Sequence, residues 1–335
     1  MRVGLALPHY DFSLPGGEPI TFARVAQVAT TAERLGFDSV WMSDHFFTSL
    51  ERYGGDAELR GSLEPLTTLA ALASLTERVR LGTLVLSAGF RHPAVLAKTA
   101  TAIDLLSGGR LDLGLGAGWY EPEYRAFGYP FGPTGERFRI LEETLEVLTR
   151  LFAEGPASYQ GERFVLHGAY NHPRPAQSPR PPIWLGGKGG PRLLGLAARL
   201  ADGWNAAWRW TPEAYAERVA AARAACERVG RDPSTLRLSL GLFTVLGQDE
   251  ADLERRYALM AGRLPTGVAD KMPLETLRRE CLAGTPEQAL ERLARFAELG
   301  VEELIVSPAP LWFALPDASM LDLLAEAVIP AAHEL

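Results

Sequence analysis

Short runs rich in Val, Ile and Leu recur along the chain and alternate with longer segments of helical spacing. The short runs are continuously apolar, which is typical of parallel strands that are covered on both faces. The pattern predicts eight strands, at residues 2–8, 39–43, 79–87, 111–118, 182–187, 203–208, 236–243 and 302–308.

The segments between these strands predict helices. Residues 134–152 repeat apolar side chains at steps of three and four, and Thr134 is the expected N-cap. The apolar positions of this face are Phe138, Leu141, Leu145, Leu148 and Phe152. Residues 93–110 and 285–300 have proline in the first turn and glycine at the end, the usual order of helix ends.

Eight strands that alternate with helices predict a (β/α)8 TIM barrel. A doubly wound open sheet is the alternative, although the first strand ends in LPHYDF rather than in the glycine-rich turn of that fold. Four segments are too long for simple connections, and we expect them to be insertions at the C-terminal face of a single domain spanning residues 1–335. These segments are residues 46–63, 117–133, 154–181 and 262–284.

Composition and charge narrow the class of protein. Of the 335 residues, 47% are hydrophobic and 22% are charged, as in ordinary soluble proteins. The net charge of −7 offers no basic surface for nucleic acid or an anionic membrane. The N-terminus becomes polar too early for a signal peptide, and Cys226 and Cys281 lack the spacing of a disulfide framework. We therefore expect a cytoplasmic protein.

Polar residues follow the second predicted strand directly, in the stretch VWMSDHFF. Catalytic groups of (β/α)8 barrels lie at the C-terminal ends of the strands, so Asp44 and His45 are candidates for catalysis. An imidazole titrates near neutral pH, and His45 is the expected proton-handling group. The alternative is that Asp44 caps a turn and His45 binds a backbone carbonyl. His9 stands at the end of the first strand in the same way.

A glycine-rich turn follows the strand at 182–187, with the sequence GGKGGPR. Its glycines let the backbone approach a ligand, and the proline suits a helix start whose N–H groups would face the turn. Lys188 and Arg192 add positive charge, so the turn predicts a phosphate site, although it is no P-loop. The glycines concerned are Gly186, Gly187, Gly189 and Gly190. A flexible loop with chance glycines is the alternative.

A second glycine-rich stretch, GLGAGWYEPEY, ends the strand at 111–118. Gly114, Gly116 and Gly118 alternate, which leaves room for a flat ligand, and Trp119 and Tyr120 begin an aromatic wall. A barrel corner with core aromatics is the alternative. The histidines lack metal-binding spacing and no GxSxG motif is present, so we expect neither a metal site nor a serine hydrolase. The combined pattern indicates a flavin-like cofactor with a phosphate tail.

With these motifs in view, the chain resembles the bacterial luciferase-like superfamily, specifically its branch of oxidoreductases dependent on the deazaflavin coenzyme F420. The resemblance is carried by GFDSVWMSDHF, by RVRLGTLVLSAGFRHPAVLAKTATAIDLLSGGRLDLGLGAGWYEPEY and by PPIWLGGKGGPRLLGLAARLADGWN. It implies a barrel with the ring in the strand mouth, a phosphate at residues 186–190, and His45 close to the reactive ring. Asp44 would orient His45 or contact the ring. It also implies a homodimer. The resemblance further implies that Thr83, Leu84 and Val85 form a bulge with a non-prolyl cis peptide behind the ring.

One position departs from the pattern: where sugar-phosphate dehydrogenases of this branch have a catalytic glutamate, this chain has Trp119, and Glu121 follows two residues later. Only three lysines are present. We therefore expect an apolar or aromatic substrate rather than a sugar phosphate, bound near His9, Trp119, Tyr120 and Trp204.

The sequence leaves three functions open. The first is hydride transfer between the deazaflavin coenzyme F420 and a small organic molecule. The second is an FMN-dependent monooxygenase that uses reduced FMN and oxygen, because the same barrel accepts both rings. The third is a non-catalytic flavin or deazaflavin binder, which the replacement of the usual glutamate by Trp119 would permit.

Overall fold

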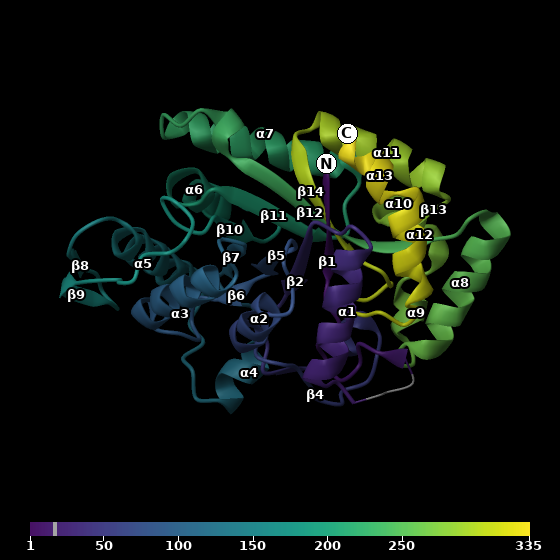
Figure 1. Cartoon of the computed structure of the whole chain (residues 1–335), viewed down its shortest axis with the longest axis horizontal. Helices are drawn as coiled ribbons and strands as arrows, with labels where there is room; N and C mark the ends of the chain where they lie inside the picture. The colour runs from purple at the N-terminus through teal and green to yellow at the C-terminus, as the bar shows by residue number, and fades with distance from the viewer. Residues whose placement is uncertain (16–18) are drawn as a thin grey trace.

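The computed structural model describes residues 1–15 and 19–335 and contains all eight predicted strands in one closed parallel barrel (Figure 1). The barrel strands are β1 (Arg2–Ala6), β2 (Ser39–Met42), β5 (Arg80–Thr83), β7 (Leu111–Gly116), β10 (Ile183–Gly186), β11 (Gly203–Trp208), β12 (Arg237–Leu246) and β14 (Val301–Ser307). Their hydrogen-bonded order is β10-β11-β12-β14-β1-β2-β5-β7, and β7 pairs with β10 to close the ring. The (β/α)8 barrel is confirmed, and the closure rules out the open sheet.

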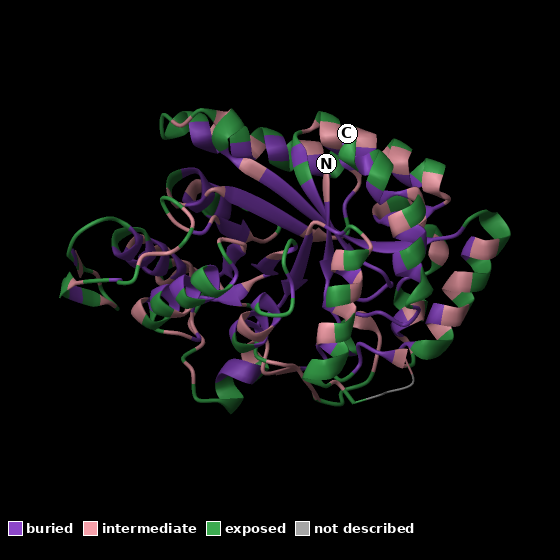
Figure 2. Cartoon of the chain, viewed as in Figure 1, coloured by how far each residue is buried: buried purple, intermediate pink, exposed green. Residues whose placement is uncertain are grey.

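The strands are buried on both faces, as Figure 2 shows by their almost continuous purple colour. The main covering helices are α1 (Phe22–Arg34), α2 (Pro65–Ala73), α3 (Pro93–Leu106), α5 (Thr134–Phe152), α6 (Pro191–Leu200), α7 (Pro212–Arg228), α8 (Glu250–Arg263) and α11 (Pro286–Glu298). Two more, α12 (Ser319–Ala327) and α13 (Ile329–His333), follow the last strand. The continuously apolar runs form strands whose two faces are both covered. Helices cover the outer face, and side chains of the barrel core fill the inner one.

The helix ends agree with the sequence patterns at two of three predicted places. The helix α3 ends just before the predicted glycine pair, and α11 starts with a capping box in which Thr285 and Gln288 bond each other's backbone N–H. In α5, by contrast, Thr134 is the first helical residue and Pro133 is the N-cap, without a side-chain cap. The expectation that Thr134 caps this helix was wrong by one position, because proline already supplies the extended residue before the helix.

Three of the four predicted insertions lie at the C-terminal ends of the strands. Residues 46–63 contain the paired strands β3 (Phe47–Thr48) and β4 (Arg60–Gly61), and residues 117–133 contain α4 (Glu121–Ala126). Residues 262–284 contain α9 (Val268–Lys271), α10 (Leu274–Glu280) and β13 (Leu282–Gly284), which pairs with the end of β12.

The fourth insertion, residues 154–181, lies at the other end of the barrel. It joins the end of α5 to the start of β10 and forms a hairpin of β8 (Ala157–Gln160) and β9 (Val165–Ala169), at the left edge of Figure 1. A connection from a helix to the next strand of a parallel barrel must return to the N-terminal face. For that reason this insertion is separated from the strand ends where chemistry is expected.

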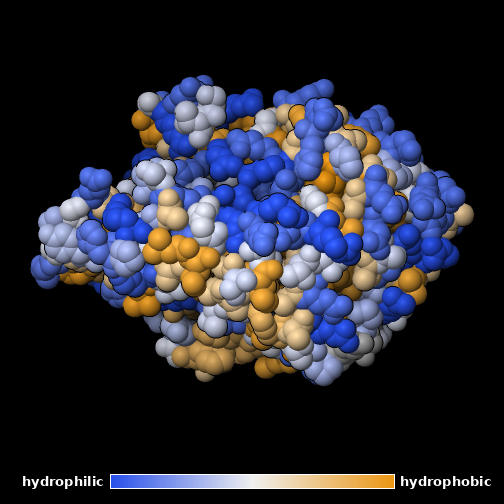
Figure 3. All heavy atoms as spheres, viewed as in Figure 1, coloured by the Kyte–Doolittle hydropathy of each residue, from blue (hydrophilic) through white to orange (hydrophobic). Residues whose placement is uncertain are grey.

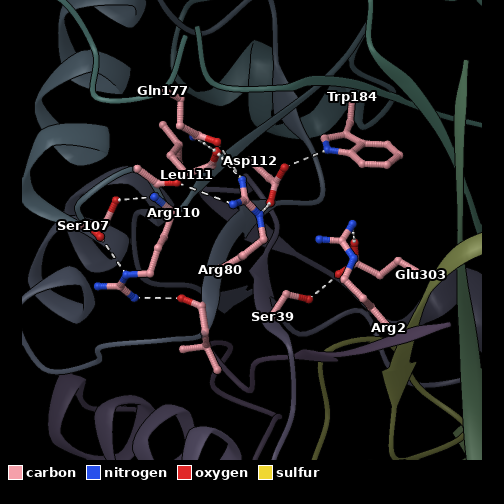
Figure 4. Close-up of polar contacts among 12 residues, drawn as sticks. Arg2, Ser39, Arg80, Ser107, Arg110, Leu111, Asp112, Gln177, Trp184 and Glu303 are labelled. Carbon is pink, nitrogen blue, oxygen red and sulfur yellow. Dashed lines mark hydrogen bonds and ion pairs between the residues drawn. The ribbon is translucent and has the colours of Figure 1, made fainter. Parts of the chain in front are cut away.

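Charged residues inside the N-terminal half of the barrel are paired with one another (Figure 4). Arg80 Nε donates to Asp112 Oδ2 over 2.5 Å, and Trp184 Nε1 donates to the other carboxylate oxygen over 3.1 Å. Arg2 donates to Glu303 over 2.9 Å, and burial raises the pKa of the Glu303 carboxyl. Each of these four charged side chains thus has a partner, so they form a structural network.

The outer surface is mixed in character. On the face seen in Figure 3, hydrophobic residues lie in several separate patches among hydrophilic ones. Among the described helices, none is both long and apolar enough to cross a bilayer.

Candidate functional site

A cavity of about 1330 Å³ opens at the C-terminal ends of the barrel strands. Residues of β7, β10, β11 and β12 line it, together with residues from the segments directly after β2, β5 and β14. The predicted site residues that reach it are Asp44, His45, Leu84, Val85, Gly116, Gly118, Trp119, Gly186, Gly187, Lys188, Gly190 and Arg192. Residues that were predicted at different strand ends, far apart in the chain, thus meet in one cavity.

His45 is held in the cavity wall by Glu123, a residue that the sequence analysis missed. His45 Nδ1 lies 2.8 Å from Glu123 Oε1, and the Phe46 N–H donates to Glu123 Oε2 over 2.9 Å. The two side chains are only 13% and 2% exposed. A carboxylate at Nδ1 favours the tautomer with hydrogen on that nitrogen. Nε2, which has no hydrogen-bond partner among the described residues, is left to exchange a proton.

Asp44 does not orient His45, contrary to one of the two roles expected for it. Its carboxylate accepts from Arg91 Nη1 and Nη2 over 2.6 and 2.9 Å, and from the Ser87 N–H over 2.9 Å. Arg91 also bonds Glu64 over 2.6 Å. Asp44 and His45 are neighbours in sequence but engage different partners, so Asp44 braces the wall beside the cavity.

The end of the third barrel strand forms the back of the cavity. The peptide bond between Leu84 and Val85 is cis, as the resemblance implied. A Cβ on Gly116 or on Gly186 would lie 2.8 or 2.6 Å from the Val85 side chain. These glycines therefore admit Val85 between neighbouring strands, a reason different from the flat ligand that the sequence suggested. Thr83 is buried behind this layer and donates to the Gly114 carbonyl over 2.9 Å.

The turn after β10 forms one end of the cavity. The helix α6 starts at Pro191 with Gly190 as its N-cap and without a side-chain cap, so its first N–H groups remain available to a ligand. A Cβ on Gly190 would meet nothing within 4 Å. Arg192 and Thr134 line the cavity here, and Arg192 lies against Gly135 at the start of α5. This end of the cavity has the residues that a phosphate requires.

The structure separates the two cations that were assigned to the phosphate turn. Lys188 Nζ lies 4.9 Å from the centroid of the Trp210 ring. Burial, followed by the positive charges of Arg209 and Arg52, lowers the pKa of Lys188. Lys188 therefore faces the side of the cavity near β11 and the insertion after β2, while Arg192 faces α5.

Aromatic side chains form much of the remaining wall. Trp119 lies with its ring centroid 5.7 Å from that of His45, and the Arg52 guanidinium stacks 5.0 Å from the centroid of the Trp119 ring. The sequence analysis did not single out five of the others, Tyr53, Trp208, Phe243, Trp312 and Phe313, as site residues. The final tryptophan of the predicted strand GWNAAW was a usable signal for Trp208.

Five other predicted site residues do not line the cavity. His9 is fully buried between the Leu7 carbonyl and Ser43 Oγ, at 2.7 and 3.1 Å, and burial lowers its pKa to about 4. Trp204 is also buried, with its indole N–H bonded to the Gly187 carbonyl over 3.0 Å. The remaining three are Thr83, Tyr120, whose hydroxyl accepts from the Ser49 N–H, and Gly189, which packs on Trp204. The structure does not bring these five residues to the cavity surface, because strand-end position alone does not fix which way a side chain points.

Two of the insertions touch each other next to residues of the cavity wall. Gly54 lies in the insertion after β2 and Gly267 lies just before α9. Both have positive φ, 91° and 85°, and a Cβ on Gly267 would lie 2.2 Å from the Gly54 carbonyl oxygen. Lys271, which lines the cavity, packs against Gly54.

The fold and this cavity define a (β/α)8 barrel with a cofactor-sized site at the strand ends. The chain belongs to the luciferase-like monooxygenase family, whose profile matches residues 1–303.

Relatives of known activity are similar along most of the chain. An F420-dependent glucose-6-phosphate dehydrogenase of Microbacterium testaceum is 31% identical over 292 residues, which cover 82% of this chain and 84% of the relative. A phthiodiolone/phenolphthiodiolone dimycocerosates ketoreductase of Mycobacterium tuberculosis is 26% identical over 338 residues, covering 86% and 87%.

Solved structures share the fold. An F420-dependent secondary alcohol dehydrogenase in complex with an F420-acetone adduct superimposes with a TM-score of 0.77 at 20% identity, covering 99% of this chain and 98% of the other. Monooxygenase RslO1 from Streptomyces bottropensis gives 0.77 at 24% identity and covers both chains fully.

Proposed function

We propose that the protein is an oxidoreductase that uses the deazaflavin coenzyme F420 and transfers a hydride between it and an organic substrate. The similarity to F420-dependent dehydrogenases over more than four-fifths of the chain carries the choice of coenzyme. The cavity supports it, because a phosphate end and an aromatic end lie within one volume of about 1330 Å³. When bound, the deazaflavin ring supplies the hydride donor or acceptor, a chemistry that side chains lack.

The residues of the chain fit this coenzyme at both ends. The uncapped start of α6, Arg192 and Thr134 would hold the phosphate. Leu84, Val85 and the adjoining glycines would support the ring from behind.

His45 is the proposed proton-handling residue. Its Nε2 would give a proton to the substrate oxygen during reduction, or accept one during oxidation. Glu123 holds Nδ1 over 2.8 Å and so keeps the ring oriented. Asp44 and Arg91 keep the neighbouring wall in place.

The substrate is proposed to have an apolar or aromatic body. Trp119, Trp208, Phe243 and Trp312 supply flat apolar surface in the cavity wall, and Trp119 and Trp312 lie next to His45. Positioning by these rings and exclusion of water would bring the reacting carbon to the coenzyme.

A paired binding titration tests this function. The purified protein is titrated with oxidised F420 and with FMN, and the fluorescence of tryptophans in the cavity wall is followed. Saturable quenching by F420 with much weaker binding of FMN is expected. Preference for FMN would favour the monooxygenase, binding of neither would refute a flavin-type site, and F420 binding without turnover on a panel of ketones, alcohols and activated alkenes would favour the non-catalytic binder.

Three further expectations stay predictions. They are the organisation of residues 1–335 as one domain, the homodimer and the cytoplasmic location. Size-exclusion chromatography with light scattering would check the dimer.

A further inference from the structure

The cavity wall carries more positive charge than its own carboxylates neutralise. Five cations line it: Arg52, Lys188, Arg192, Arg209 and Lys271. The lining carboxylates are Asp44, Glu123 and Glu280, and each is already engaged, with Arg91, His45 and Arg209 respectively. Among the described residues, neither Arg52 nor Lys188 has a carboxylate within ion-pairing distance.

These two cations are held in place by aromatic rings rather than by acids. The Arg52 guanidinium lies 5.0 Å from the centroid of Trp119, and Lys188 Nζ lies 4.9 Å from that of Trp210. Cation–π contacts orient a charge but leave it able to bind an anion. Both side chains therefore present their charge to the cavity without neutralising it.

Keeping like charges together in a partly buried site costs free energy. Lys188 is surrounded by Arg209 and Arg52, and this crowding adds to burial in disfavouring its charged form. An anion bound between these groups would remove the repulsion. Such an arrangement is typical of a binding site for an anionic ligand group.

This charge lies apart from the phosphate end of the cavity. Arg192 lies against Gly135 at the start of α5, next to the open N-terminus of α6. Lys188 points instead to the loop that follows β11, toward Trp210. A coenzyme phosphate at α6 would leave Arg52 and Lys188 unpaired.

We propose that Arg52 and Lys188 form a subsite for an anionic group, a carboxylate or a phosphate, carried by the substrate. The inference rests on the proposed function and refines its substrate class: an apolar or aromatic body on the rings near His45, with one acidic end. Lys271, at the contact between the two insertions, adds a third positive charge to the same wall. The count of three lysines in the sequence did not reveal this charge, because Arg52 of the 46–63 insertion supplies part of it.

The test uses three aromatic probes of similar size: benzoate, phenyl phosphate and neutral benzamide. Each is titrated into the protein with saturating F420, and separately without coenzyme, while tryptophan fluorescence is followed. One or both anions are expected to bind at least tenfold more tightly than benzamide, and the tighter one identifies the anionic group. Equal binding of all three probes would overturn the subsite.

Variants assign the effect to these residues. Arg52→Gln and Lys188→Met should each weaken the preferred anion at least tenfold and leave benzamide binding and F420 affinity unchanged. Arg228→Gln, an exposed change at the end of α7, is the control and should alter nothing. If the two variants weaken F420 as strongly as the anion, the cations belong to the coenzyme and the subsite is refuted. Failure of F420 to bind would refute the proposed function, whereas the titrations without coenzyme would still decide the subsite.

Discussion

Glu123 and His45 are 78 positions apart in the chain, yet Glu123 Oε1 lies 2.8 Å from His45 Nδ1 in the wall of the cavity. The pair joins the start of α4 to the end of β2, so the insertion at 117–133 fixes the orientation of the imidazole. This geometry gives Glu123 a positioning role that its place in the sequence did not reveal.

Loss of His45 should impair turnover far more than coenzyme binding. General acid–base groups typically contribute about 100-fold or more to rate. His45→Ala is therefore expected to lower kcat by about 100-fold with nearly unchanged F420 affinity. Steady-state kinetics and the F420 titration together check this, and unchanged kcat would remove His45 from the mechanism.

Glu123→Gln should lower kcat and leave F420 affinity nearly unchanged. The carboxylate bonds both His45 Nδ1 and the Phe46 N–H, whereas an amide has only one acceptor oxygen, so the imidazole should be less firmly oriented. Steady-state kinetics and the F420 titration measure the two effects separately. Glu121→Gln is the matched control, because Glu121 pairs with the exposed Arg125 on the same helix. Equal losses of kcat and of F420 affinity would mean that Glu123 is only structural.

Arg192→Gln should weaken F420 binding about tenfold or more, since hydrogen bonds to charged groups contribute about 1.5–3 kcal/mol each. The loss should be largest at low ionic strength, where charges are least screened. Fluorescence titrations at two salt concentrations measure it, with Arg228→Gln as control. Equal affinity for the wild type and Arg192→Gln would place the phosphate elsewhere.

Arg91→Met should destabilise the fold by about 3–5 kcal/mol, because it leaves the Asp44 carboxylate buried without its partner. Asp44 is only 4% exposed, whereas Arg125 and Glu121 form a surface pair at 78% and 42% exposure. Arg125→Gln should therefore cost less than about 1 kcal/mol. Urea denaturation measures both, and Asp44→Asn combined with Arg91→Met should recover part of the loss.

His9 should make the protein less stable in mild acid. Burial lowers its pKa to about 4 in the folded protein, against 6.5 for the free side chain. Between these values the unfolded chain binds the extra proton, so the free energy of unfolding falls as the pH is lowered from 6.5 toward 4. The contribution of His9 should fall by about 2 kcal/mol between pH 7.5 and pH 5.

The measurement for His9 compares denaturation curves of the wild type and His9→Gln at these two pH values. The variant lacks the titrating ring, so the difference between the two proteins isolates His9 from other acids, including Glu303, whose raised pKa acts in the opposite direction. Parallel pH profiles of the two proteins would contradict the prediction.

The barrel was predictable because its signals are local. Continuous apolar runs mark buried parallel strands, and their regular alternation with helices leaves few ways to arrange them. At the strand ends, His45 and all residues of the turn at 186–190 except Gly189 lie in the cavity wall.

The direction of side chains was less predictable, because it depends on the residue at which a helix begins within each insertion. Since α4 begins at Glu121, it is Glu123, two residues later, that turns inward to His45, while Glu121 faces Arg125. Trp312 and Phe313 follow the last strand in a stretch without any periodic pattern, so nothing in the sequence pointed them toward the cavity.

The contact between Gly54 and Gly267 joins two insertions that contribute Arg52, Tyr53 and Lys271 to the cavity wall. Two segments more than two hundred positions apart meet backbone to backbone there, and neither position has space for even a methyl group. Any larger residue at one of them would have to shift one insertion against the other. Because these insertions carry Arg52, Tyr53 and Lys271, the backbone fit of two glycines outside the cavity governs how one part of its wall is held together.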